Sequence, residues 1–233
     1  MKLKICGMNH NPTEVAQLQP DYLGFIFWEP SSRYFLGDMP KLSSSIKKVG
    51  VFVDAPLEEV LEKVEQYQLN AVQLHGKESA EYCKALKEGF LSFRAQSRNQ
   101  GNFNQKEVST TLDLTTLEII KVFSIKDDFD FDVLKDYEEV CDYFLFDTKG
   151  KLPGGNGYTF DWDVLKKYPS NKPYFLSGGI GLDSEEKLKE FLNSPASKNC
   201  FAIDVNSKFE TAPGLKNIED LKIFIESLKS GHN

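Results

Sequence analysis

The chain has 233 residues and a formal net charge of −7. This length suits one large domain or two small ones, and it can bury a core without disulfides or a structural metal. The negative charge and the lack of a basic run argue against non-specific nucleic-acid binding, whereas a small anionic substrate is allowed if local cations serve it.

Four cysteines, Cys6, Cys83, Cys141 and Cys200, are scattered without CxxC or histidine spacing. This pattern argues against a zinc site and a disulfide framework and indicates reduced thiols. No apolar run approaches the roughly 18 to 20 residues of a membrane span, and no charged leader precedes an apolar stretch at the N-terminus. We therefore expect a cytoplasmic protein with neither a membrane nor a nucleic-acid partner.

Short apolar runs with the length and composition of buried strands recur along the chain. The eight runs are KLKIC at 2–6, YLGFIF at 22–27, KVGVFV at 48–53, NAVQLH at 70–75, EIIKVFS at 118–124, DYFLFD at 142–147, PYFLS at 173–177 and CFAIDV at 200–205. Amphipathic helical patterns lie between several of them, for example at 56–67 and 183–192, and another occupies the tail. In the pattern at 183–192, Asp183 is the expected N-cap, with Glu186 three residues later.

Strands alternating with helices eight times predict a parallel sheet closed into one (β/α)8 TIM barrel over residues 1–233. An open doubly wound sheet is the main competing fold, but the loop after the first strand lacks the GxGxxG of dinucleotide-binding folds. A polar stretch at about 91–116 is roughly twice as long as a simple connection needs. We expect it to be an insertion or excursion on the surface.

Polar groups gather at the carboxyl ends of these apolar runs, which is where barrels carry their active sites. They are Cys6, Arg33, His75, Asp147, the SGG at 177–179 and Asp204. Singly, each has a structural explanation, because a thiol can pack inertly, a carboxylate can cap a loop, an arginine can form a surface ion pair and a glycine can serve a turn. Their joint placement at successive strand ends favours a functional site.

Lys4 and Cys6 are two residues apart on the first predicted strand, so both should face the barrel interior, with Lys4 one layer deeper. A thiol that acts as a base needs a lowered pKa, and the ammonium group of Lys4 would help to hold Cys6 as a thiolate. The alternative is that Lys4 pairs with an interior carboxylate, and both interpretations can hold together.

Several motifs together carry a resemblance to a known family. They are KICG at 4–7, GFIF and SSRY within 24–34, VGVFV at 49–53, VQLHG at 72–76, FDTKGKLPGGNGYTFDW at 146–162, LSGGI at 176–180 and IDVNSKFETAPGLK at 203–216. In this order they resemble phosphoribosylanthranilate isomerases, the barrel enzymes of tryptophan biosynthesis. Lys208 departs from the family, which usually has glycine after the serine of the last motif, and a lysine there could itself favour an anion.

The resemblance implies an Amadori rearrangement of N-(5'-phosphoribosyl)anthranilate without a cofactor or metal. It implies Asp147 as the general acid that protonates the furanose ring oxygen and Cys6 as the general base that removes the proton from the second carbon. An acid near neutrality needs a carboxyl that is partly desolvated. The family includes monomers and dimers, so the resemblance leaves a homodimer open.

The substrate's carboxylate and phosphate need donors. Arg33 suits the carboxylate because its guanidinium is planar and always charged. The residues expected to bind phosphate are Gly178, Gly179, Asn206 and Ser207, in the loops after strands seven and eight. His75 and Asp204 are carried over only as residues that line the site. The PGGNG at 153–157 is expected to close over the substrate.

Two other phosphate-binding barrel enzymes are alternatives. An indole-glycerol-phosphate synthase typically depends on a lysine and glutamates at strand ends, where this chain has Cys6 and Asp147. A ribulose-phosphate epimerase would need a cluster of His and Asp around a metal, and the chain has only His10, His75 and His232. The alternative from another class is a catalytically inactive phosphate-binding barrel, against which the presence of Cys6, Arg33 and Asp147 argues.

Overall fold

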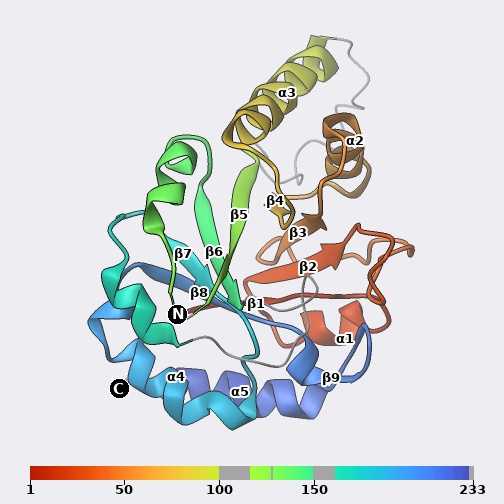
Figure 1. The fold of residues 1–233 in the computed structure, drawn as a ribbon. Helices are drawn as coiled ribbons and strands as arrows, with labels where there is room; N and C mark the ends of the chain where they lie inside the picture. The colour runs from red at the N-terminus through yellow and green to blue at the C-terminus, as the bar shows by residue number, and fades with distance from the viewer. Residues whose placement is uncertain (100–115, 127, 149–160, 231–233) are drawn as a thin grey trace.

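A closed barrel of eight parallel strands forms the centre of the computed structural model, which describes residues 1–99, 116–126, 128–148 and 161–230 (Figure 1). The strands are β1 (Lys2–Ile5), β2 (Tyr22–Ile26), β3 (Lys47–Phe52), β4 (Ala71–Leu74), β5 (Glu118–Ile125), β6 (Tyr143–Thr148), β7 (Tyr174–Leu176) and β8 (Cys200–Val205). Each strand pairs with the next along the chain, and β8 pairs with β1 to close the sheet. The predicted TIM barrel and all its strands are confirmed, and the open doubly wound sheet is ruled out.

The outer layer is less regular than strict alternation predicts. Its α-helices are α1 (Pro12–Ala16), α2 (Leu57–Tyr67), α3 (Ala80–Asn99), α4 (Glu185–Leu192) and α5 (Ile218–Ser230). Short 3₁₀ turns are η1 (Phe131–Tyr137), η2 (Trp162–Lys167), η3 (Leu182–Ser184), η4 (Pro195–Asn199) and η5 (Ser207–Phe209). The fully described connection between β2 and β3 contains no helix, and a 3₁₀ turn stands in place of the α-helix between β5 and β6. Eightfold alternation of strand and helix is therefore wrong in detail.

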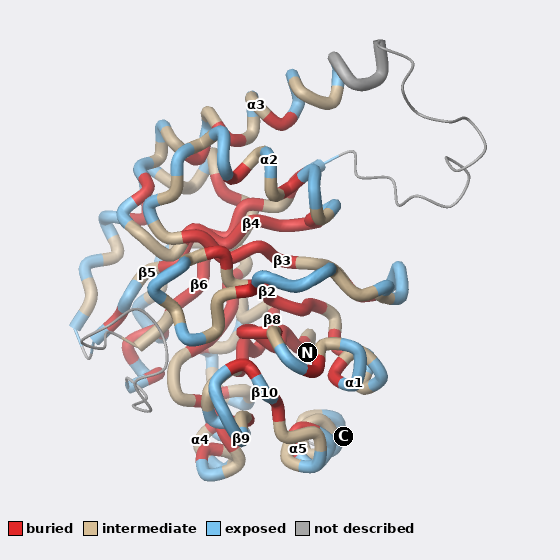
Figure 2. The backbone as a smooth tube through the Cα atoms, turned by 90° about the vertical axis from the view of Figure 1, so that its right-hand side faces the viewer, coloured by how far each residue is buried: buried red, intermediate tan, exposed pale blue. Residues whose placement is uncertain are grey.

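Two further expectations from the sequence concern the helices. α3 continues to Asn99, so the first part of the polar stretch at 91–116 is helical, while residues 100–115 lie outside the described part of the chain. α3 lies beside α2, and its far end projects beyond the barrel (Figures 1 and 2). The expected N-cap Asp183 is wrong, because η3 precedes α4 and makes Ser184 the capping residue. None of the described helices is long and apolar enough to cross a membrane.

Alternation along the strands divides the apolar side chains into two shells. One cluster fills the barrel interior on the side away from the carboxyl ends of the strands. It consists of Tyr22, Val49, Ala71, Ile120, Val122, Leu145, Phe175 and Ala202. A larger cluster packs between the sheet and the outer layer, and Figure 2 shows the strands buried almost throughout. Because successive side chains point to opposite faces, each of the strands β2 to β8 contributes to both clusters, whereas β1 contributes Leu3 and Ile5 to the outer cluster alone. The pocket described below opens at the carboxyl ends of the strands, beyond this filled interior.

The chain leaves β8 through η5 and a small antiparallel hairpin before α5. The hairpin consists of β9 (Glu210–Ala212) and β10 (Leu215–Lys216). Its first residue, Glu210, and its last, Lys216, are both turned toward the barrel mouth, as the contacts described below show.

Candidate active site

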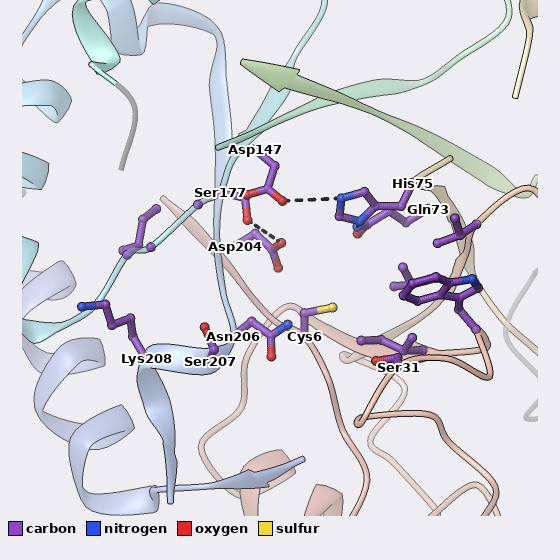
Figure 3. A pocket seen from close by; sticks show the side chains of 17 residues that line it. Cys6, Ser31, Gln73, His75, Asp147, Ser177, Asp204, Asn206, Ser207 and Lys208 are labelled. Carbon is purple, nitrogen blue, oxygen red and sulfur yellow. Dashed lines mark hydrogen bonds and ion pairs between the residues drawn. The ribbon is translucent and has the colours of Figure 1, made fainter. Parts of the chain in front are cut away.

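A pocket opens at the carboxyl ends of the barrel strands (Figure 3). Its lining residues are Cys6, Ile26, Trp28, Ser31, Val51, Val53, Gln73, His75, Asp147, Ser177, Gly178, Gly179, Ile180, Asp204, Asn206, Ser207 and Lys208. They come from the ends of seven strands, all but β5, or from the loops that follow them, as expected for a barrel. The thiol of Cys6 and the carboxyl of Asp147 therefore share one cavity.

The structure brings together all the predicted site residues except one. Cys6, His75, Asp147, Gly178, Gly179, Asp204, Asn206 and Ser207 line the pocket. Gly178 and Gly179 have φ angles of +95° and +69°, which favour glycine and let the chain turn directly after β7. The PGGNG at 153–157 lies outside the described residues.

Arg33 is the exception, because its guanidinium is held by a carboxylate instead of lining the pocket. Nε and Nη2 of Arg33 donate to Glu210 at distances between 2.6 and 2.9 Å. Glu210 also accepts from Nζ of Lys216 at 2.7 Å, and the same ammonium donates to Oδ1 of Asn206 at 2.8 Å. Burial raises the pKa of Glu210, but Arg33 and Lys216 outweigh it and lower the pKa. Arg33 is thus joined to the pocket wall through two ion pairs and the hydrogen bond from Lys216 to Asn206.

Lys4 lies under Cys6 and is fully buried, as its position on β1 predicts. Its Nζ donates to Oδ1 of Asp204 at 2.7 Å, and Oδ2 of Asp204 accepts from Oγ of Ser177 at 3.1 Å. Burial lowers the pKa of Lys4, but Asp204 and Cys6 together outweigh that effect and raise it. The expected pairing of Lys4 with an interior carboxylate is confirmed.

The effect of these charges on Cys6 differs from the expectation. Burial raises the pKa of the Cys6 thiol above its ordinary value, and the charge of Asp204 raises it further. Lys4 and Lys216 lower the pKa without offsetting burial. Lys4 therefore restrains the rise of the thiol pKa, and the expected net lowering is not found.

His75 and Asp147 face each other across the pocket (Figure 3). Nε2 of His75 lies 3.5 Å from Oδ2 of Asp147, and Nδ1 lies 3.3 Å from the amide nitrogen of Gln73. Since the Gln73 amide donates to Nδ1, the ring proton of neutral His75 sits on Nε2 and faces Asp147. The other oxygen of Asp147 accepts from the backbone N–H of Thr148 at 2.8 Å.

Sequence reasoning missed Gln73, which is only 2% exposed and lines the pocket. Its Oε1 has no hydrogen-bond partner among the described residues, which is costly for a buried polar atom. The signal was available, because Gln73 is a polar residue inside an apolar strand and two positions before His75, on the same face.

The loop that carries His75 is held by a buried ion pair that sequence reasoning also missed. Nζ of Lys121 on β5 donates to Oε2 of Glu78 at 3.0 Å and to the carbonyl oxygen of Gly76 at 2.8 Å. Glu78 in turn accepts from the backbone N–H of Gly76. These contacts fix the chain on the C-terminal side of His75.

Comparison with known proteins gives a consistent result. The family model described as N-(5'-phosphoribosyl)anthranilate (PRA) isomerase matches residues 3–113 and 100–227. A relative from Parabacteroides distasonis, named N-(5'-phosphoribosyl)anthranilate isomerase, is 38% identical over 238 residues, which cover 98% of this chain and 93% of the relative.

Solved structures resemble the barrel over its whole length. The phosphoribosyl anthranilate isomerase from Thermus thermophilus matches with a TM-score of 0.73 and 26% identity, over 99% of both chains. A phosphoribosyl anthranilate isomerase in complex with reduced 1-(o-carboxyphenylamino)-1-deoxyribulose 5-phosphate matches with a TM-score of 0.70 and 25% identity, again over 99% of both chains.

Substitution of Lys4 by methionine tests the buried pair. Lys4→Met should lower the free energy of unfolding by about 3 to 5 kcal/mol, because it leaves the Asp204 carboxylate buried without its partner. It should also raise the pKa of the Cys6 thiol further, because one lowering charge is lost. Urea unfolding checks the first effect, and the pH dependence of Cys6 alkylation, followed by mass spectrometry of its peptide, checks the second. An unchanged alkylation profile would show that Lys4 does not act on the thiol.

Gly24 on β2 tests the room left for the thiol. A Cβ at Gly24 would lie 2.8 Å from Sγ of Cys6 and 3.1 Å from its Cα. Gly24→Ala should therefore cost about 1 to 3 kcal/mol in stability and change the rate of Cys6 alkylation. Gly37→Ala is the matched control, since its Cβ meets nothing closer than 3.5 Å. Equal behaviour of the two variants would contradict the tight packing at Cys6.

Proposed function

Because the chain belongs to the N-(5'-phosphoribosyl)anthranilate isomerase family, we propose that it converts N-(5'-phosphoribosyl)anthranilate to 1-(o-carboxyphenylamino)-1-deoxyribulose 5-phosphate, with Cys6 as the general base and Asp147 as the general acid. The observation that carries the proposal is the common pocket of the thiol and the carboxyl at the barrel mouth. The complex of a related isomerase with a reduced form of this product supports the choice of substrate.

In the proposed reaction, Asp147 gives its proton to the furanose ring oxygen, so that the ring opens and the nitrogen forms a Schiff base with the first carbon. Oδ1 of Asp147 is held by the backbone of Thr148, and Oδ2 faces the pocket beside His75, so Oδ2 is the oxygen suited to carry the transferred proton. Cys6 then takes the proton from the second carbon. The resulting enolamine tautomerises to the ketone.

The raised pKa of Cys6 has a consequence for this base. The thiolate is scarce at neutral pH, but once formed it is a stronger base than an ordinary thiolate, because basicity follows pKa. Lys4 and Lys216 are the two cations that keep its pKa from rising further. The rate of proton abstraction should therefore increase with pH over the range below the thiol pKa.

The substrate has two anionic groups, a phosphate and a carboxylate, and we assign them to different residues. We assign the phosphate to Gly178, Gly179, Asn206 and Ser207, which line the pocket side by side in the loops after β7 and β8. We assign the carboxylate to Arg33. The resemblance implies this role, and because Nε and Nη2 of Arg33 donate to Glu210, the substrate's carboxylate has to compete with Glu210 for the guanidinium.

Removal of either proton-transfer group tests the mechanism. Cys6→Ala and Asp147→Asn should each lower kcat by about two to four orders of magnitude while the protein remains folded. The assay is the loss of anthranilate-type fluorescence on addition of freshly generated phosphoribosylanthranilate. Cys200→Ala is the matched control, because Cys200 lies at the start of β8, outside the pocket. Normal turnover by Cys6→Ala would refute the acid–base assignment.

Arg33 should act on binding and not on proton transfer. Arg33→Ala should raise KM by roughly tenfold or more, since a charge-assisted contact to the carboxylate is lost, and should change kcat little. Steady-state kinetics separate the two parameters. Arg94→Ala, on α3 and away from the pocket, is the control. A loss confined to kcat would argue that Arg33 has another role.

A further inference from the structure

Lys208 forms part of the pocket wall at the end where the loops after β7 and β8 meet. It belongs to η5, directly after Asn206 and Ser207, and it lines the pocket together with Gly178 and Gly179. Figure 3 shows Lys208 on the opposite side of the pocket from Gln73 and His75. Its position places a flexible cation beside the loops to which we assign the substrate's phosphate.

The ammonium group of Lys208 is paired with Asp183 of η3. Nζ lies 2.8 Å from Oδ2 of Asp183, so the pair links the loop after β8 to the loop after β7. The Lys208 side chain is 33% exposed and the Asp183 side chain 65%. An ion pair this exposed is weak, because water screens it and both side chains lose freedom in forming it. The ammonium can therefore change partner at little cost.

The first carbons of the Lys208 side chain pack beside Gly181. A Cβ at Gly181 would lie 2.9 Å from Cβ of Lys208 and 3.2 Å from its Cγ, so the absence of a side chain at Gly181 makes room for the stem. The backbone of η5 and this contact hold the start of the side chain at the pocket. The charged end reaches from there to Asp183.

The charge balance of the pocket favours an anion at Lys208. Among the lining residues, all of them in the described part of the chain, Lys208 is the one lysine or arginine. The wall also carries the carboxyl groups of Asp147 and Asp204, of which Asp204 is already paired with Lys4. A phosphate that enters this pocket therefore meets no other permanent cation among the described lining residues.

We propose that Lys208 is a phosphate-binding residue of this site and that Asp183 is its internal counter-ion, which the phosphate of the substrate replaces. The inference rests on the proposed function for the identity of the phosphate ester, and it adds to the backbone donors a cation from a position where the family resemblance leads one to expect glycine. Exchange of a monoanionic carboxylate for a phosphate, which carries up to two negative charges at neutral pH, provides the driving force.

Binding of inorganic phosphate to the full-length protein tests the proposal without turnover. Lys208→Gln should weaken phosphate binding by about five- to tenfold and reduce its dependence on salt, because one charge-assisted contact is lost. Asp183→Asn should strengthen phosphate binding, because the competing carboxylate is gone. In the double variant, the effect of Asp183→Asn should disappear. Isothermal titration calorimetry at two ionic strengths measures all three.

Lys189→Gln is the matched control, because Lys189 also forms an exposed pair, with Glu186 on α4, but does not line the pocket. It should bind phosphate as the wild type does. Three results would overturn the proposal: no measurable phosphate binding by the wild type, unchanged binding by Lys208→Gln, or equal weakening by Lys208→Gln and Asp183→Asn. The last result would mean that the pair only holds the two loops together.

The same measurements separate this inference from the proposed function. Wild-type turnover of phosphoribosylanthranilate with unchanged phosphate affinity in Lys208→Gln overturns the role of Lys208 alone. Phosphate binding that depends on Lys208, without turnover of phosphoribosylanthranilate, overturns the proposed isomerisation and keeps Lys208 as an anion-binding residue.

Discussion

The pocket depends on one buried interaction, the ion pair between Lys4 of β1 and Asp204 of β8. A fully buried ammonium is tolerated only with a partner that is also hydrogen-bonded, and Ser177 completes the set from the end of β7. The pair joins the strands that close the barrel. It also forms a polar layer between the apolar barrel interior and the pocket. The positive charge of Lys4 and the negative charge of Asp204 nearly cancel at this floor of the pocket.

This ion pair at the floor of the pocket affects the pKa of the Cys6 thiol. Desolvation by burial is the largest influence on the pKa of Cys6 and raises it; Lys4 opposes that rise, and the charge of Asp204 works against Lys4. The result is a thiol with a raised pKa. Proton abstraction by such a group relies on the strength of the base and on close placement at the reacting carbon, which the tight approach of Gly24 to Cys6 makes possible.

Much of the fold and part of the site could be predicted from local patterns. The period of two in strands placed Lys4 and Cys6 on one interior face, and polar residues at strand ends marked Cys6, His75 and Asp147 as neighbours. Interactions between distant residues could not be predicted this way. Arg33 meets Glu210 across 177 positions of the chain, and the sequence shows no sign that the hairpin after β8 would return a carboxylate to it. The net pKa of Cys6 was out of reach for the same reason, since it depends on burial as well as on the neighbouring charges.

The contrast between the floor and the rim of the pocket explains how one site can combine fixed and exchangeable charges. At the floor, Lys4 and Asp204 are almost inaccessible to water, so neither can be released without leaving a buried charge. At the rim, Lys208 and Asp183 are partly hydrated, so separating them costs little. A charged ligand can therefore displace an ion pair at the rim but not at the floor. Binding of an anionic group of the ligand can therefore break the ion pair at the pocket entrance while the geometry around Cys6 and Asp147 stays in place.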